Sequence, residues 1–289
     1  MTFHPARGLC SVAITGAGSG LGRDIALAFA ARGCIVFGTA ASTQEVNEVR
    51  HASGKRVSLT ACDIANADAA TAWAGGVSDA LDGAGLDVLI SNPSALTPGP
   101  IETLPLSAAQ RAFDVNVLGA LTVINAFLPA LRKARGRVIQ LSSWTAELAL
   151  PFDGLSAASM SAIEALAAVY RAELKPFGID VVVAPIAKLK IGATAEMMAA
   201  CAVASANMTS DQRHLYGARF KTFATRWAEF HADGIEATDA AAHVIDIAGR
   251  SPAPHRAAVG FDPAEMLPIT REQSDDERDA LRLKLVGLS

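Results

Sequence analysis

Short apolar runs rich in β-branched residues alternate with longer segments rich in Ala and Leu along the chain. The short runs are bounded by Gly, Asp, Asn, Pro or Ser, which commonly flank strands. We expect strands over residues 11–15, 34–39, 57–62, 87–91, 137–142, 180–184 and 257–261. Strands that alternate with helices are typical of βαβ units. The pattern predicts an α/β fold with a Rossmann-type, doubly wound parallel sheet, and we expect a single domain because no repeat or linker interrupts it.

Two of the intervening segments are unusually long and apolar. Ser107 and Gln110 have the spacing of a capping box, which predicts a helix over 108–133, and a second helix is expected over 156–175. Their apolar positions exceed one helix face. The excess either covers the sheet or packs against another subunit, so we expect a homo-oligomer or a hetero-oligomer.

Beyond Pro185 the pattern becomes less regular. An Ala- and Met-rich helix is expected over 193–206 and a mixed aromatic helix over 215–231. This helical region, about 187–235, is expected to cover the carboxyl ends of the strands, where such sheets bind ligands. A second capping box, Ser274 with Glu277, predicts a surface helix within 274–289.

Composition and charge exclude several classes of protein. The chain has 289 residues, 51% of them hydrophobic and 19% charged, with a net charge of −4, so neither disorder nor nucleic-acid binding is expected. The four cysteines form no C-x-x-C pair, which favours a reducing cytoplasm. We expect no secretion signal and no membrane span. The six histidines lack ligand spacing, so no metal site is expected.

A glycine-rich loop, Thr15-Gly16-Ala17-Gly18-Ser19-Gly20-Leu21-Gly22, follows the first expected strand and leads into a helical pattern over 24–31. Such glycines allow a tight turn and let a pyrophosphate approach the backbone at the positive helix N-terminus. The loop therefore indicates a dinucleotide-type fold.

Further motifs follow in a fixed order. They are Asp63-Ile64, Asn92, Asn116-Val117-x-Gly119 and Ser142-Ser143. With the glycine loop, they resemble the short-chain dehydrogenase/reductase (SDR) family over essentially the whole chain. The stretch Tyr216-Gly217-x-x-Phe220 and the Leu-rich end resemble, more weakly, the branch of 17β-hydroxysteroid dehydrogenases.

The resemblance implies a role for each matching residue. Asn116 and Ser143 correspond to catalytic positions. The cofactor side is formed by Thr15, Gly16, Gly20, Leu21, Gly22, Asp63, Ile64 and Asn92. Each of these residues also has a purely structural interpretation, because glycines are favoured in tight turns, and Asn and Ser side chains form hydrogen bonds with backbone groups.

The family's catalytic Tyr-x-x-x-Lys pair is missing. The residues four positions after Tyr170 and Tyr216 are Leu174 and Phe220. Counting 13 residues from Ser143 reaches Ser156, which places Met160 at the lysine position. A serine hydroxyl is a far poorer acid than a tuned phenol, and methionine carries no charge. Proton transfer by the family's route is therefore not expected.

The cofactor side departs from the family as well. Asn-Ala-Gly is replaced by Asn92-Pro93-Ser94, and Pro-Gly by Pro185-Ile186. The family's Thr beyond that glycine falls at Lys190, and Ala40 and Ala41 stand where an acidic residue or an arginine would hold the ribose. We expect no NAD(P), or weak binding of it.

Three functions remain open. The first is a noncatalytic SDR-like protein, the inactive partner of an active SDR paralogue. The second is a redox-independent enzyme in which Asp153 or a lysine, Lys188 or Lys190, acts as acid or base, although these are expected to be solvated loop charges. The third is an NAD(P)-dependent oxidoreductase with an unusual proton donor. We also consider a small apolar ligand near Ser143. Aromatic and Met residues at this spacing are more often plain core, so core is the favoured interpretation for Trp144, Phe152, Met197, Met198 and Trp227.

Overall fold

A computed structural model describes residues 10–186, 188–190, 193–260 and 273–288. Its centre is a six-stranded parallel sheet in the order β3-β2-β1-β4-β5-β6. The strands are β1 (Ser11–Ile14), β2 (Ile35–Ala40), β3 (Val57–Ala61), β4 (Val88–Ser91), β5 (Arg137–Ser143) and β6 (Asp180–Ile186). The strand order reverses between β1 and β4, so the prediction of a doubly wound α/β fold is confirmed.

The expected seventh strand, 257–261, is not formed as a strand. Arg256 and Val259 make isolated parallel bridges with Val183 and Ile186 of β6, and residue 261 lies outside the described residues. Val259 donates its N–H to the carbonyl of Pro185, 2.9 Å away. Pro185 has no N–H to donate in return, so a continuous ladder cannot form beside it.

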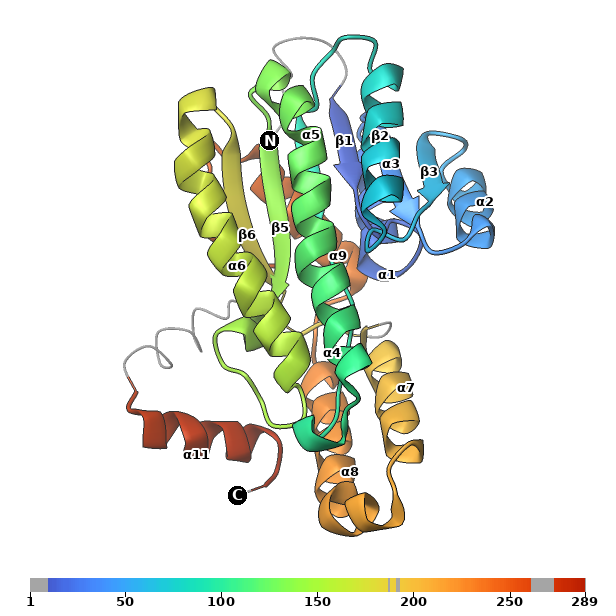
Figure 1. The fold of residues 1–289 in the computed structure, drawn as a ribbon. Coiled ribbons are helices and arrows are strands. Elements are labelled where there is room, and N and C mark those ends of the chain that lie inside the picture. The colour runs from blue at the N-terminus through green and yellow to red at the C-terminus, as the bar shows by residue number, and fades with distance from the viewer. Residues whose placement is uncertain (1–9, 187, 191–192, 261–272, 289) are drawn as a thin grey trace.

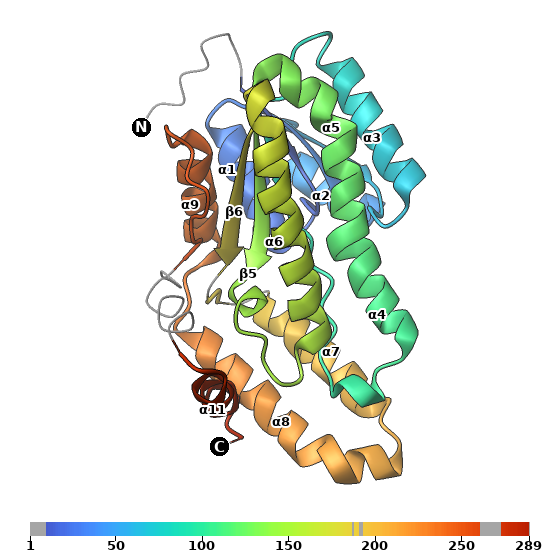
Figure 2. The ribbon, with the colours of Figure 1, turned by 60° about the vertical axis from the view of Figure 1, so that its left-hand side comes forward.

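Helices cover both faces of the sheet (Figures 1 and 2). On one face lie α1 (Gly20–Ala31) and α9 (Ala237–Gly249), with α2 (Thr43–Ala52) at the β3 edge. On the other lie α3 (Ala67–Ala80), α5 (Ala120–Ala134) and α6 (Gly154–Leu174). Each face has its own apolar core, with Phe29 fully buried in one and Phe127 in the other. The helix α9 was not predicted from the sequence pattern.

The first long apolar helix begins earlier than predicted and contains a change of winding. It starts as α4 (Leu106–Phe113), passes through the π-helical segment η2 (Asp114–Gly119) and continues as α5. The prediction of a capping box at Ser107 is wrong, because Pro105 is the N-cap and its carbonyl accepts the Ala108 N–H. Proline's fixed φ suits this position.

The same helical run changes the expectation about membrane spans. Leu106–Ala134 is long and apolar enough to cross a membrane by length and composition alone. Half of its most apolar window is buried inside the molecule, and core helices meet the same criterion. In this structure the run is a core element that packs against the sheet and α3.

The remaining helices lie beyond the carboxyl ends of the strands (Figure 2). The helix α7 (Ala193–Ala206) has its predicted bounds, whereas α8 (Ser210–Ala232) begins before residue 215 because Thr209 and Gln212 form a capping box. The predicted box at Ser274 is confirmed and opens α11 (Asp275–Leu285). The described residues also form three short 3-10 helices, η1 (Ile101–Thr103), η3 (Trp144–Ala146) and η4 (Lys175–Phe177).

Candidate functional site

The glycine loop is held by its neighbours in the sheet. Gly16 has φ +63°, which favours glycine, and its N–H donates to Thr39 Oγ1 at 2.9 Å. Asn92 donates its N–H to Thr15 Oγ1 at 2.7 Å and its Nδ2 to the Thr15 carbonyl at 3.2 Å. A Cβ at Gly22 would lie 2.0 Å from the Gly16 carbonyl oxygen. These residues therefore fit one another closely without any ligand.

A cavity of about 300 Å³ opens between this loop, the end of β5, α7 and α8. Its volume is at the lower end for small-molecule sites. Many of the expected site residues meet here: Gly16, Gly20, Leu21, Gly22, Asn92, Pro93, Ser94, Ser143, Met160 and Ile186. Trp144, Met197 and Trp227 join them, whereas Phe152 packs on Phe220 and Phe223, and Met198 is exposed.

The charge of the cavity wall is negative. Among the described lining residues are two carboxylates, Glu45 and Glu196, and no Lys or Arg. Glu45 Oε2 accepts the Ala41 N–H at 2.8 Å and lies 2.2 Å from where a Cβ of Gly18 would be. Burial, reinforced by the charge of Glu45, raises the pKa of Glu196. Neither carboxylate was among the residues predicted from the sequence, and Glu45 brings an acidic group next to Ala41.

One histidine, His231 of α8, lies on the same wall. It is 5% exposed, and its ring stacks on Trp227 with centroids 4.5 Å apart. Its Nδ1 lies 2.9 Å from the Trp227 carbonyl oxygen, which can only accept, so this nitrogen carries the proton. Burial lowers the pKa of His231, which favours the neutral ring with Nε2 unprotonated.

The two positions that the count from Ser143 assigns to the catalytic tyrosine and lysine lie on α6 and hold packed side chains. Ser156 is buried and its Oγ accepts the Thr97 N–H at 3.0 Å. Met160 is 7% exposed, lines the cavity and packs with Ala120 and Ile163. Neither places a cationic group or a phenol beside Ser143.

Asn116 lies apart from the cavity, in the π-helical turn. It is fully buried; Oδ1 accepts the Ala95 N–H at 2.9 Å, and Nδ2 donates to the Ala95 carbonyl and to Ser159 Oγ. Its amide is therefore committed to holding the loop after β4. This arrangement matches the structural reading of Asn116.

Asp63 and Ile64, which the resemblance assigns to the adenine side, also lie outside the described cavity wall. Arg111 bonds Asp63 through two nitrogens, at 2.8 and 3.2 Å, and this contact lowers the pKa of the Asp63 carboxyl. Ile64 is 8% exposed and packs in the core.

The expectation that Asp153 is a solvated loop charge is wrong. Asp153 is 2% exposed, and its Oδ1 is buried with no hydrogen-bond partner among the described residues. Burial raises its pKa to about 6, and the side chains of Ser156 and Thr145 offset part of this rise. Lys190 pairs with Glu236 at 3.4 Å, and the Lys188 ammonium lies over the Phe230 ring. Of the three candidate charges, only Asp153 lies buried.

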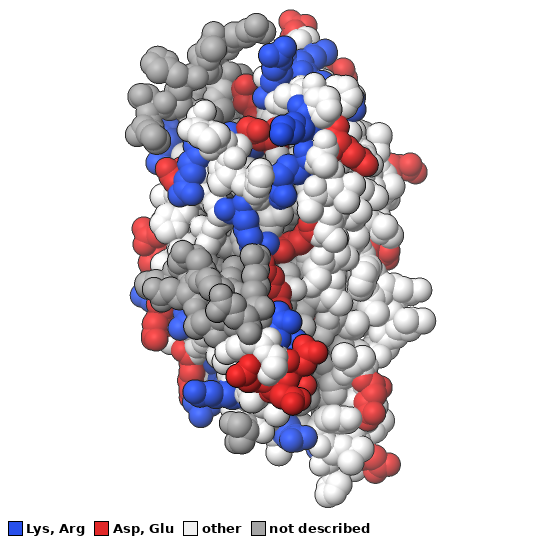
Figure 3. Space-filling model, turned by 90° about the vertical axis from the view of Figure 1, so that its left-hand side faces the viewer, with Lys and Arg blue, Asp and Glu red and all other residues white. Residues whose placement is uncertain are grey.

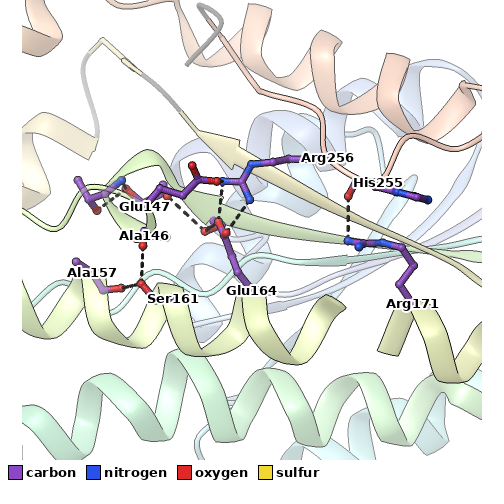
Figure 4. Close-up of polar contacts among 11 residues, drawn as sticks. Ala146, Glu147, Ala157, Ser161, Glu164, Arg171, His255 and Arg256 are labelled. Carbon is purple, nitrogen blue, oxygen red and sulfur yellow. Dashed lines mark hydrogen bonds and ion pairs between the residues drawn. The ribbon is translucent and has the colours of Figure 1, made fainter. Parts of the chain in front are cut away.

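An ion cluster fixes the loop that carries Ser143 (Figure 4). Arg256 contacts Glu164 of α6 at 2.7 Å and Glu147, just after η3, at 2.9 Å. The Ser161 hydroxyl lies 2.6 Å from the Ala146 carbonyl oxygen (Figure 4). Ser142 donates to Glu164 at 2.6 Å. The η3 turn is thus attached both to α6 and to the segment after α9.

Comparison with known proteins assigns the family. A family model described as short chain dehydrogenase matches residues 11–199. The chain belongs to the short-chain dehydrogenase family. Retinol dehydrogenase 16 of Mus musculus is 30% identical over 215 residues, 72% of this chain and 67% of that protein. The likeness to 17β-hydroxysteroid dehydrogenases is confirmed by the human type 6 enzyme, which is 29% identical over 187 residues, 63% of this chain and 58% of that protein.

Solved structures of SDR proteins share the whole fold. A short-chain dehydrogenase from Streptomyces avermitilis matches with a TM-score of 0.75 and 22% identity, covering 98% of this chain and 96% of that one. A short-chain dehydrogenase from Burkholderia cenocepacia in complex with NADP matches with a TM-score of 0.71 and 23% identity, covering 96% of this chain and 97% of that one. The chain spans about half to two thirds of the curated relatives.

SDR proteins use a nicotinamide dinucleotide, and the cavity of this chain does not fit one held for hydride transfer. No described lining residue brings a cation to the phosphates, and Glu45 and Glu196 add like charge near the glycine loop. At the other end, Pro93 lacks an N–H, and the side chains of Met160 and Ile186 line the space. Glu45 alone suits the cofactor, since a carboxylate can accept from ribose hydroxyls.

Proposed function

We propose that this SDR protein does not carry out the family's hydride transfer. It works by binding a small, largely apolar ligand and by association with a second subunit, either its own copy or an active paralogue. The observation that carries the proposal is the pair Ser156 and Met160, buried at the positions of the proton donor and its lysine. The Ser156 hydroxyl accepts the Thr97 N–H and bonds the Asp153 carboxyl, and it is too weak an acid to substitute for a phenol of lowered pKa.

The charge and shape of the cavity support a ligand other than a dinucleotide. An apolar wall with two carboxylates and no described Lys or Arg disfavours anions and accepts neutral molecules. Trp144, Trp227 and Met197 offer broad apolar contact to such a molecule.

Association is supported by an exposed apolar surface on the helices beside the site. Leu106 of α4, Leu118 of η2 and Val169 of α6 are each more than half exposed. The side of the molecule on which these helices lie, at the right of Figure 3, shows few charged side chains. Exposed apolar side chains of this kind favour contacts between subunits.

A calorimetric titration with NADH and with NADPH tests the first part of the proposal. We expect dissociation constants in the millimolar range or weaker. The loss of two or three contacts, at about 1.5–3 kcal/mol each, removes enough binding free energy to turn a micromolar dissociation constant into a millimolar one. Saturable binding at low micromolar concentration would contradict it.

Variants that restore the family's residues at the site provide a second test of the proposal. Ser156→Tyr with Met160→Lys restores the proton donor alone, and we expect no NAD(P)H oxidation with a panel of ketones. Adding Ile186→Gly reopens the nicotinamide end and should be the first change to give turnover, since hydride transfer needs reacting atoms about 3–3.5 Å apart. Turnover by the wild type would overturn the proposal, and turnover by the double variant would show that the cofactor end is intact.

A further inference from the structure

A chain of polar groups runs from the cavity into the protein behind Ser143. Ser143 lines the cavity, and its Oγ lies 2.8 Å from Thr145 Oγ1. The Thr145 side chain in turn approaches the Asp153 carboxyl. Thr145 and Asp153 are 1% and 2% exposed, so water has little access to the inner part of this chain. Two hydroxyls therefore link the cavity to a buried carboxyl group.

The surroundings of Asp153 favour a carboxyl group that holds a proton. Phe152 and Leu150 precede it, and the Cys201 thiol from α7 faces it, with a pKa raised to about 12 by burial and by the Asp153 charge. No cation contacts Asp153 among the described residues. An apolar site of this kind keeps a carboxylic acid neutral, and a neutral carboxylic acid can donate.

The backbone at this place is strained. Phe152 has φ +69°, a left-handed conformation that a bulky side chain rarely adopts. Its carbonyl accepts the Gly99 N–H at 2.8 Å, and its ring packs against both Phe220 and Phe223. Such strain is found where the surrounding structure holds a functional group in place, here the next residue, Asp153.

A base lies on the same cavity wall. His231 has Nδ1 bonded to the Trp227 carbonyl, and no described residue is a partner of its Nε2. Lys188, whose ammonium lies over the Phe230 ring, adds positive charge nearby and helps keep the imidazole neutral. The cavity therefore combines a hydroxyl connected to an acid with an imidazole that can accept a proton.

We infer that this cavity catalyses proton transfer on a neutral ketone with an apolar body, with Ser143 at the carbonyl oxygen and His231 at the adjacent carbon. Asp153 and Thr145 are positioning and proton-holding residues, because they act through Ser143. The inference goes beyond the proposed lack of hydride transfer, and no nicotinamide takes part in it.

For a β,γ-unsaturated ketone the steps balance without a co-reactant. His231 Nε2 takes a proton from the α-carbon, and the C–H electron pair becomes the new C=C bond of a dienol. The carbonyl oxygen takes the Ser143 proton, Ser143 takes that of Thr145, and Thr145 that of Asp153. His231 then returns its proton to the γ-carbon, and the enol proton goes back along the hydroxyls to Asp153. The product is the conjugated ketone.

The test follows conjugation of 3-cyclohexenone and of a β,γ-unsaturated 3-ketosteroid by ultraviolet absorbance, without nucleotide. We expect turnover by the wild type and losses of about 10²- to 10⁴-fold in Ser143→Ala, Asp153→Asn and His231→Gln. Asp233→Asn and His214→Gln, both on exposed residues, are matched controls that should keep the wild-type rate.

The pH profile separates the inferred relay from a structural role of Asp153. The rate should fall above pH 6, where Asp153 loses its proton, and should fall again at lower pH as His231 gains one. In Thr145→Val the rate should be low and the fall above pH 6 absent. Conversion of both ketones no faster than by Ser143→Ala, or an Asp153→Asn variant as fast as wild type, would overturn the inference. Neither result depends on whether the protein binds NADH.

Discussion

The two ends of the cavity differ in how far they keep the SDR pattern. At the glycine-loop end, Thr15, Gly16, Gly22 and Asn92 retain the family's residues and bond or pack against one another. At the other end, Ser156 and Met160 stand where the resemblance predicts the tyrosine and the lysine, and Ile186 stands where it predicts a glycine. On the proposed function, this difference means that residues which also build the fold remain, whereas residues needed only for hydride transfer are replaced.

The largest expected effect tests whether the glycine loop is needed for folding alone. In Gly22→Ala the new methyl group would lie 2.0 Å from the Gly16 carbonyl oxygen, which is backbone and cannot move aside cheaply. We expect unfolding in urea to show a loss of about 3 kcal/mol or more, without any nucleotide present. Gly75→Ala, on the exposed face of α3 with no atom near, is the control and should gain about 0.5–1 kcal/mol. A loss at Gly22 no larger than a few tenths of a kcal/mol would contradict the folding role.

The next effect concerns the altered end and depends on pH. The pKa of Asp153 is raised from 3.8 to about 6 in the folded protein, so folding favours its protonated form. Its burial therefore opposes stability above pH 6 and ceases to do so below about pH 4. Asp153→Asn should stabilise the protein by up to about 3 kcal/mol at pH 7.5 and by little at pH 4.

Urea unfolding of wild type and variant across this pH range measures the effect. Asp233→Asn, exposed at the end of α8, should show no such trend. A difference between wild type and Asp153→Asn that stays constant with pH would mean that Asp153 does not titrate as described.

The smallest effect concerns the exposed apolar side chains of α4 and α6. Sedimentation at tens of micromolar should show a dimer or tetramer. Leu106→Lys with Val169→Lys should raise the dissociation constant about tenfold or more, corresponding to about 1.4 kcal/mol. Leu215→Lys changes an equally exposed leucine on α8 and should leave association unchanged. A monomeric wild type would refute the proposal, and co-purification with a chain that has Tyr-x-x-x-Lys would favour a paralogue as partner.

The sheet and the replaced positions could be predicted from the sequence because their signals are local. Strand periodicity placed six strands, and the count from Ser143 placed Ser156 and Met160 on one helix. Asp153 could not be read in this way, because it stands in a Pro-Phe-Asp-Gly segment typical of an exposed turn. Its burial comes from α6, α7 and the aromatic side chains of α8.

The negative charge of the cavity wall also could not be predicted from the sequence. Glu45 and Glu196 are separated in sequence by most of the sheet, and only the fold brings the first turns of α2 and α7 to one wall of the cavity. His231 shows no motif spacing, and its tautomer follows from a carbonyl one turn earlier in the same helix.

The π-helical turn at Asp114–Gly119 explains why the apolar positions of 106–134 exceed one face. Each residue of an α-helix advances the side-chain direction by about 100°, and a wider turn interrupts this advance. The apolar stripe of α4 is therefore out of phase with that of α5. A helical wheel drawn with one constant period superimposes the two stripes and shows a cylinder that is apolar nearly all round. The molecule instead has two narrower apolar stripes, offset from each other around the helix axis at the π-helical turn. The apolar stripe of α5 faces the sheet, whereas that of α4 faces in a different direction.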